Sequence, residues 1–299
     1  MTQRRSNCRV LASALLVLCS LWASLWTTSA FSQAPAAAQP RNLVIIIDDL
    51  GNQLAAGRQA IALPGKLNMA ILPHTPNGAR LAQLSLDAGK EVLLHAPMSN
   101  SRNKPLGPGA LTSEMDREQL LQTLAASIDS TPGVRGVSNH MGSQLTAQRE
   151  PMEWVMQELA ARGLYYIDSR TTADSLGAEI AKEYGIPHLT RQIFLDNDPD
   201  PDAIHLQFIK ALAVADRTGI AIVIGHPYSS TLEYLAQQLP HLEGQGYQLA
   251  LASEVLVQQE RLALTPLQTS DNKPDAADTP TYLVSDAGPD SDAGGTAIN

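Results

Sequence analysis

The chain has 299 residues, of which 17% are charged, and a formal net charge of −9. This length allows one large domain or two ordinary ones, with enough residues for a sizeable core. Beyond the N-terminus there is no run of Lys and Arg. The composition therefore argues against nucleic-acid binding, which requires a basic surface for the phosphate backbone.

The N-terminus has the pattern of an export signal. Three arginines precede an apolar stretch at 11–26, and small residues that suit cleavage follow up to Ala34. We expect a signal peptide and the start of a linker over 1–34, more linker over 35–41, and a periplasmic or secreted protein. The alternative is an uncleaved membrane tether, although about 16 apolar residues are few against the roughly 20 that a span needs.

Both cysteines, Cys8 and Cys19, lie within the expected signal peptide. The exported chain would then have no cysteine, which excludes disulfides, thiolate catalysis and zinc sites built from cysteine. At the other end, residues 264–299 carry six Asp and one Lys. Because this composition buries too little apolar surface to offset the entropy of ordering, we expect a disordered acidic tail there.

The folded domain is expected over residues 42–263, where short apolar runs alternate with amphipathic stretches. The runs predicted as strands are 42–48, 67–72, 91–95, 134–138, 164–168, 190–195, 220–225 and 247–252. Predicted helices cover 112–128 with Ser113 as N-cap, 150–163 ending at Gly163, and 202–219. This alternation is typical of an α/β fold with a parallel sheet, and about eight strands suit a barrel.

Acids and histidines stand at the ends of these strands. Asp48 and Asp49 end the first predicted strand, and His95 ends the third. Comparable positions after other strands are occupied by His74, His140, Asp168, Asp196, Asp198 and His226. In α/β barrels the loops that follow the strands converge on one rim, which carries the chemistry. We therefore expect these side chains to meet at one site.

Carboxylates and imidazoles without thiolates are a typical zinc ligand set. A catalytic zinc has three protein ligands and an open position for water, which one Asp and two His would supply. The other Asp of the pair would then be free to act as general base on water whose pKa the metal lowers. Zinc is the first choice of divalent metal, although Fe, Co or Ni accept the same ligands.

Five short segments carry a family resemblance: IIIDDLG (45–51), HAPM (95–98), NHMGS (139–143), DSRTT (168–172) and IGHP (224–227). In this order they resemble the divergent polysaccharide deacetylases, which are distant relatives of the NodB-type carbohydrate esterases. The resemblance covers about residues 42–260. It implies a distorted, incomplete (β/α) barrel of about seven to eight strands. It also implies metal-dependent removal of acetyl groups from the N-acetylated sugars of a polysaccharide or oligosaccharide substrate.

The same resemblance implies roles for the paired acids and two histidines. Asp48 would be the general base, and Asp49 a metal ligand. The typical family takes both histidine ligands from one H-x-x-x-H segment, but Ser99 stands four residues after His95. His95 and His140 are therefore the expected histidine ligands.

Three further residues receive roles in the same way. His226 in IGHP would protonate the departing amine. Asp168 is a candidate to orient His226 or to contact the substrate. Arg191 is a candidate to pair with Asp48 and hold the pKa of that carboxyl down.

Three functions are left open by the sequence. The first is an active deacetylase of an envelope or extracellular polysaccharide. The second is a non-catalytic, metal-containing glycan-binding or scaffold protein of the cell envelope, which the departure from H-x-x-x-H favours. The third is a metal-dependent amidase or esterase with another substrate. The presence of Asp48 favours the two enzymes, because a purely structural metal site needs only Asp49.

Overall fold

The structure is a computed structural model that describes residues 41–264. The expected signal peptide, the linker up to residue 40 and the tail after Leu264 lie outside the described residues. Arg41, expected as the last linker residue, instead begins β1 (Arg41–Leu50), and its guanidinium pairs with Asp216. Within the described range, no helix is both long and apolar enough to cross a membrane.

The sheet is built around β1, the first and longest strand. One side of β1 pairs with β8 (Ile220–Gly225), and the other side pairs with β2 (Asn68–Ile71) and, at its start, with β9 (Tyr247–Leu249). All these pairings are parallel, and the strand order is β6-β5-β4-β3-β2-β1-β8-β7. The remaining strands are β3 (Glu91–Met98), β4 (Val134–Met141), β5 (Tyr165–Asp168), β6 (His188–Thr190) and β7 (Ile193–Phe194).

The predicted α/β fold with an incomplete parallel barrel is confirmed. The run 190–195, predicted as one strand, is divided between β6 and β7. β6 pairs with β5, whereas β7 pairs with β8 at the other end of the strand order. Within the described residues the strand order contains eight strands, in agreement with the expected seven to eight, and β9 is added beside the start of β1. The barrel wall is open between β6 and β8.

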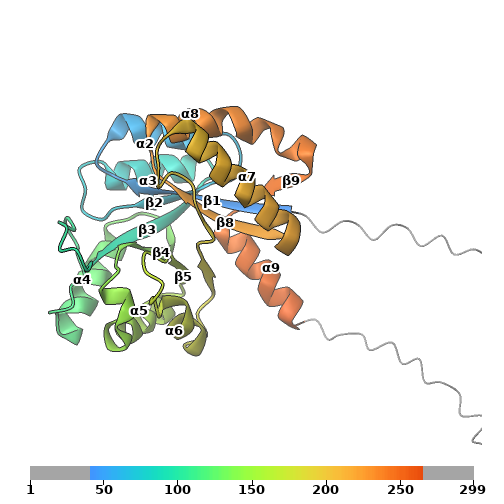
Figure 1. The fold of residues 1–299 in the computed structure, drawn as a ribbon. Helices are drawn as coiled ribbons and strands as arrows, with labels where there is room; N and C mark the ends of the chain where they lie inside the picture. The colour runs from blue at the N-terminus through green and yellow to red at the C-terminus, as the bar shows by residue number, and fades with distance from the viewer. Residues whose placement is uncertain (1–40, 265–299) are drawn as a thin grey trace, which may run out of the picture.

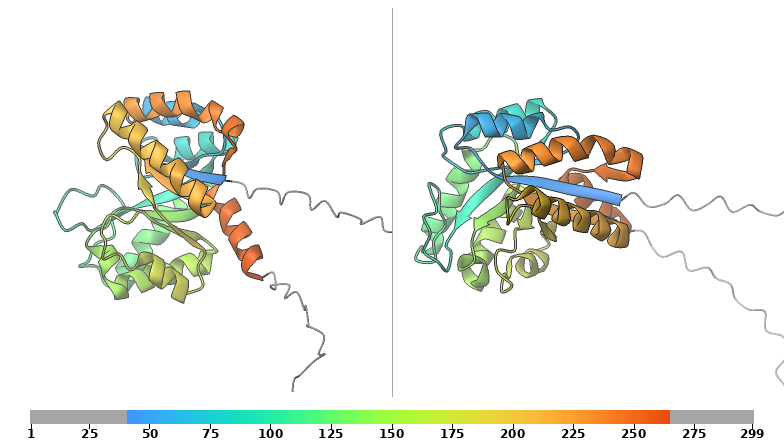
Figure 2. Two further views of the ribbon diagram at one scale, coloured as in Figure 1. Left: turned by 45° about the vertical axis from the view of Figure 1, so that its right-hand side comes forward. Right: turned by 45° about the horizontal axis from the view of Figure 1, so that its top comes forward.

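Helices cover the outside of this sheet in two groups (Figure 1). One group consists of α2 (Leu54–Ala62), α3 (Gly78–Asp87) and α8 (Ser229–Gln238), and the other of α4 (Arg117–Asp129), α5 (Arg149–Arg162) and α6 (Gly177–Glu183). The strands run between the two groups in both views of Figure 2. α7 (Pro201–Thr218) lies along β8, and α9 (Ala252–Leu264) lies near β6. Short 3-10 turns occupy Leu145–Ala147, Leu239–His241 and Glu243–Gln245.

Alternating side chains of β1 enter two different cores. Ile45 and Ile47 pack with the side chains of α2, α7 and α8, whereas Val44 and Ile46 join the barrel interior. All four side chains are fully buried. Burial on both faces explains why the strand is a continuous aliphatic run and not an alternating one.

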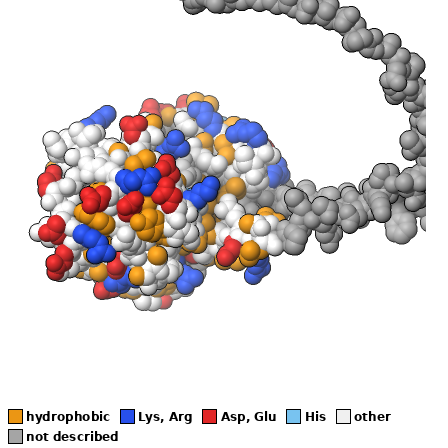
Figure 3. All heavy atoms as spheres, turned by 90° about the horizontal axis from the view of Figure 1, so that it is seen from below, with side chains coloured by type: hydrophobic (Ala, Val, Ile, Leu, Met, Phe, Trp, Pro, Cys, Tyr) orange, Lys and Arg blue, Asp and Glu red, His pale blue; other side chains and the backbone are white. Residues whose placement is uncertain are grey.

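Seen from below, acidic and basic side chains are interspersed on the surface (Figure 3). α5 and α6 lie on the lower side of Figure 1, and Arg149 of α5 pairs with Glu179 and Glu183 of α6 and with Glu153 of its own helix. These exposed pairs join the two helices, although each contributes little to stability.

The start of α4 differs from the prediction. Asp116, and not Ser113, is the N-cap: its carboxylate accepts a hydrogen bond from the Gln119 backbone, and the Gln119 side chain accepts one from the Asp116 N–H. This reciprocal arrangement satisfies two donors that the first turn would otherwise leave free. The end of α5 agrees with the prediction, because Gly163 adopts the left-handed conformation with φ 65°.

We expect Asp116→Ala to lower the free energy of unfolding by about 1 kcal/mol, because the first turn of α4 loses its cap. Urea denaturation followed by circular dichroism measures this change. Glu118→Ala, in the same turn, is the control and should change the free energy by less than about 0.5 kcal/mol. Equal effects of the two substitutions would contradict the importance of the cap.

Candidate functional site

The two acids at the end of β1 reach the same place because the backbone turns between them. In a regular strand, adjacent side chains point to opposite faces. Asp48 continues the inward direction of Ile46, so Asp49 would follow Ile47 outward. Instead Asp49 has φ 60°, and the register of β1 against β2 shifts at this point. Both carboxylates consequently lie within 3.4 Å of the ring of His95.

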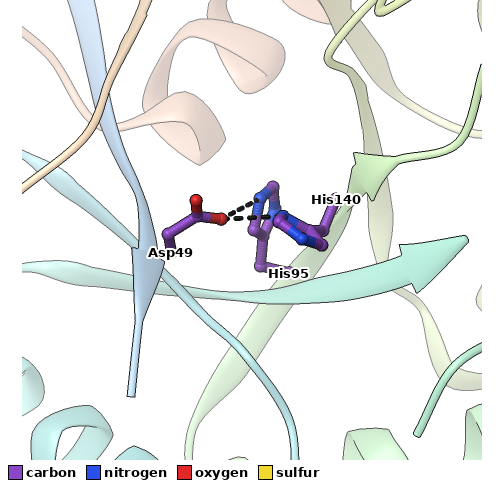
Figure 4. Close-up of side chains that lie close together, drawn as sticks. All are labelled: Asp49, His95 and His140. Carbon is purple, nitrogen blue, oxygen red and sulfur yellow. Dashed lines mark ion pairs between the residues drawn. The ribbon is translucent and has the colours of Figure 1, made fainter. Parts of the chain in front are cut away.

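Asp49, His95 and His140 form one cluster, to which β1, β3 and β4 contribute one residue each (Figure 4). Asp49 Oδ1 lies 3.2 Å from His95 Nε2 and 2.8 Å from His140 Nδ1. The two imidazole rings meet edge to face, with centroids 5.1 Å apart. One ligand atom from each residue lies within 4.8 Å of the others. The structure thus brings together the three residues expected to bind metal.

Strand pairing explains why His140 stands in for a second histidine after His95. β3 continues as an extended strand to Met98, so a residue four positions after His95 would lie about 13 Å further along the strand, too far to bind the same ion. β4 runs beside β3 in parallel register, with His140 opposite Pro97. The ring of His140 therefore reaches Asp49 from the neighbouring strand.

The donor set suits a divalent cation. His95 Nδ1 lies 2.8 Å from Ser138 Oγ, a contact that leaves Nε2 to face Asp49. Within residues 41–264, the buried oxygen Asp48 Oδ1 has no hydrogen-bond partner, and Asp49 Oδ1 faces the nitrogens of His95 and His140. A buried carboxylate is costly unless a charge or a metal compensates it. A cation held by Asp49 and the two imidazoles would supply that compensation.

Burial has opposite outcomes for the two acids. Burial raises the pKa of Asp48 above its ordinary value, although the charges of His95, His226 and His140 act against it. Burial alone would also raise the pKa of Asp49, but His140 and His95 hold it well below its ordinary value. The raised pKa suits Asp48 to accepting a proton, whereas the lowered pKa keeps Asp49 negatively charged.

The expected ion pair between Arg191 and Asp48 is wrong. The Arg191 guanidinium donates from Nε to the carbonyl of Ser169 at 2.5 Å and from Nη2 to the carbonyl of Arg170 at 2.7 Å. These two carbonyls belong to the loop after β5, and they hold the guanidinium. Asp48 Oδ2 instead lies 3.4 Å from Nε2 of His95.

Asp196, and not Asp168, orients His226. Asp196 Oδ1 lies 2.9 Å from His226 Nδ1, and Oδ2 accepts hydrogen bonds from the His226 backbone and from Thr231 Oγ1. Asp196 follows β7, which pairs with β8, and His226 follows β8. The two residues are therefore neighbours across adjacent strands.

Asp168 has a different task. Its Oδ1 accepts a hydrogen bond from the Arg170 backbone, and its Oδ2 accepts bonds from the Ser175 hydroxyl and the Ala178 backbone. The side chain is buried, and these contacts fasten the loop between β5 and α6. The expected role in orienting His226 is therefore wrong.

The surroundings of His226 favour its protonated form. Burial alone would lower the pKa of His226, but the hydrogen bond with Asp196 and the charges of Asp48 and Asp49 raise it to about 9. Its free Nε2 lies 3.8 Å from Asp49 Oδ2. The ring can therefore offer a proton at the edge of the cluster at neutral pH.

A cavity of about 490 Å³ opens beside these groups, with Asp49, His140 and His226 in its wall. Residues 105–108 line it from the other side. The ring of Tyr228 also lines the cavity, is 48% exposed and stacks on His226 with 5.5 Å between centroids. The volume is that of an ordinary small-molecule site.

Sequence reasoning missed the roles of Asp196, Ser138 and Tyr228. Of these three residues, Asp196 alone has a local signal of its role, because it directly follows an apolar run in the sequence. His74, which the sequence placed among the rim residues, lies apart: its ring is exposed, and its Nε2 is 3.5 Å from Ser127 Oγ of α4.

Comparison with known proteins identifies the family. Residues 45–256 match the family described as divergent polysaccharide deacetylase. The chain belongs to the divergent polysaccharide deacetylase family. The resemblance seen in the sequence is thereby confirmed over most of the described residues.

Two bacterial proteins are similar in sequence to this member of the deacetylase family. The uncharacterized protein YibQ of Escherichia coli K12 is 33% identical over 200 residues, which are 67% of this chain and 63% of YibQ. The chain thus spans less than two thirds of the length of YibQ. An uncharacterized protein of Haemophilus influenzae is 32% identical over 219 residues, or 73% of this chain and 76% of that protein.

A solved structure supports the fold. The crystal structure of an uncharacterized protein from Agrobacterium tumefaciens C58 aligns with a TM-score of 0.69 at 23% identity. The alignment covers 74% of this chain and 91% of that one. The two proteins therefore share the incomplete barrel.

We expect His95→Ala and His140→Ala each to abolish binding of a divalent metal, because each removes one of three converging ligands. Elemental analysis of the purified proteins, with about one metal per chain in the wild type, measures this. His74→Ala is the matched control and should keep the metal. Retention of the metal by both ligand variants would refute the assignment.

We expect Asp196→Asn to lower the pKa of His226 from about 9 toward the ordinary value near 6.5, because an amide does not stabilise the imidazolium. The ring would then be mostly neutral at pH 8 in the variant and mostly charged in the wild type. An NMR pH titration of the imidazole resonances measures the shift. Asp198→Asn, two residues along, should leave the titration unchanged.

Proposed function

We propose that this protein is a metal-dependent hydrolase that removes acetyl groups from the N-acetylated sugars of an envelope or extracellular polysaccharide. One observation carries the proposal: Asp48, the cluster around Asp49, and His226 lie together beside one cavity. Family membership supports a carbohydrate substrate. The export pattern of residues 1–34 supports action outside the cytoplasm, in the periplasm or beyond.

Asp49, His95 and His140 would hold the metal. Bound there, a divalent cation supplies a Lewis acid and lowers the pKa of water. We propose zinc, because one carboxylate and two imidazoles with an open position are a ligand set that it prefers.

Asp48 is the proposed general base. Its side chain is buried beside His95, and its Oδ1 is free of hydrogen bonds within the described chain. Because burial raises its pKa, Asp48 takes up a proton more readily than an exposed aspartate does. It would accept the proton of the water that attacks the acetamide carbonyl.

His226 is the proposed general acid. Asp196 holds Nδ1, so Nε2 is the nitrogen that faces the cavity side of the cluster. With a pKa of about 9 the ring is protonated at neutral pH. It would donate this proton to the departing sugar nitrogen, which leaves as an amine once the bond to the acetyl carbon breaks.

The cavity lining suits a neutral sugar. Tyr228 offers an aromatic face, and Asn52, Gln53 and Thr75 offer hydrogen-bonding groups to hydroxyls. No Lys or Arg is among the lining residues. The recognised part of the substrate is therefore expected to be uncharged.

We expect Asp48→Asn to lower turnover by about 10²- to 10⁴-fold while the bound metal stays, because an amide cannot accept the proton. Acetate release from oligosaccharides of N-acetylglucosamine, with metal content measured on the same samples, tests this. Loss of the metal together with activity would show that Asp48 is a ligand. Metal-loaded wild type that releases no acetate from any N-acetylated glycan would support the non-catalytic scaffold instead.

A further inference from the structure

A second cavity lies where the barrel wall is open. It measures about 920 Å³, which is larger than the cavity beside the candidate site. β6 lines one side and the first half of β8 the other, with the end of α7 and Gln259 of α9 beside them. We call this space the wall groove. It lies on the flank of the barrel and shares no lining residue with the first cavity.

The wall groove exposes a free strand edge. Tyr166 N donates to Pro187 O, and Arg191 N donates to Asp168 O, so these backbone groups beside β6 face β5. Because backbone groups alternate in direction along a strand, those of His188 and Thr190 face the groove. Across the groove, β7 pairs only with the second half of β8. An edge of this kind can pair with an extended peptide.

The groove is basic, although the whole chain is acidic. Its lining includes Arg170 and Arg191, which follow β5 and β6, Arg217 in the last turn of α7, and His188, whereas no Asp or Glu is among the lining residues. Arg170 and Arg217 are exposed and form no ion pair with a described residue. Burial lowers the pKa of Arg191, whereas the charges of Asp168 and Asp48 raise it and so already compensate this guanidinium in part. An anionic occupant would instead complement the exposed side chains of Arg170 and Arg217.

We propose that the wall groove is the docking site of the acidic segment 265–299 of the same chain, whose backbone pairs with the free edge of β6. This segment carries six Asp and one Lys. Its apolar run Tyr282–Val284 stands between Asp278 and Asp286. The groove lining combines the two complementary kinds of side chain, arginines and the apolar Leu189, Ile220 and Ile222.

The connection is short enough for docking within one chain. The segment begins after Leu264, at the end of the helix whose Gln259 lines the groove. Residues 265–281 lead from there to the apolar run. Even at half extension, a chain of that length reaches roughly 25–30 Å. The five helical residues from Gln259 to Leu264 place the start of the segment only about 7–8 Å from the groove lining, so the segment can reach back to it.

Amide hydrogen exchange on the full chain tests the proposal. The test variant replaces the six Asp of 265–299 by Asn, which keeps the length and removes the charge. We expect the amides of His188 and Thr190, which face the groove, to exchange about tenfold faster in this variant, because docking that closes the edge nine-tenths of the time slows exchange by about that factor. The amide of Leu189 faces β5 and should not change. Amides of α3 should not change.

Substitutions in the groove provide the reciprocal test. Arg170→Glu combined with Arg217→Glu should accelerate exchange in β6 equally, and both side chains are exposed, so the fold should persist. Arg191 is left intact because it holds the loop after β5. Arg80→Glu on the exposed surface of α3 is the matched control and should have no effect. High salt should accelerate β6 exchange in the wild type alone, since it screens the attraction.

Two results would overturn the proposal. Equal exchange of β6 in the wild type and in the Asp-to-Asn variant would show that the segment does not dock there. Protection that rises with protein concentration would show that the occupant is a second copy and not the same chain. Acetate release is not the readout, so neither result depends on the proposed catalytic activity.

Discussion

The site depends on one backbone turn at the end of β1. Asp49 is held at φ 60°, a conformation that costs a residue with a side chain about 1–2 kcal/mol, although Asp tolerates it better than most. Gly51, with φ 135°, completes the turn, because a Cβ there would lie 2.2 Å from Thr75 Oγ1. Without this turn, Asp49 would face the outer helices, and the cluster with His95 and His140 would lack its carboxylate.

The same kind of strain recurs along the rim. His74, Met141 and Arg170 also have positive φ, and each stands where the chain leaves β2, β4 or β5. Left-handed residues of this kind are tolerated where the surrounding structure over-determines them, and they gather at functional sites. In this protein the parallel sheet beneath them, whose strands β2 and β3 are buried along their whole length, provides that constraint.

Charge compensation links the parts of the site. Asp49 faces two imidazoles, Asp48 faces one of them, and Asp196 neutralises His226 from behind. Each buried charge would be costly alone, so the groups are stable only as a set. The open barrel wall has the same origin. β7 pairs with β8 and not with β6, which places Asp196 beside His226. It also leaves β6 without a neighbour on one side, where the wall groove opens.

The sequence by itself determined the parallel α/β fold, the strand ends that carry the reactive side chains, and the set Asp49, His95 and His140. These follow from local patterns, namely buried apolar runs that end in polar residues and a known order of motifs. It did not determine which acid serves His226, because Asp168 and Asp196 both follow short apolar runs. Only the strand order, set by packing across the whole sheet, places Asp196 beside His226 and leaves Asp168 to fasten a loop. The position of the Arg191 guanidinium was decided in the same way, by carbonyls that tertiary folding brings within its reach.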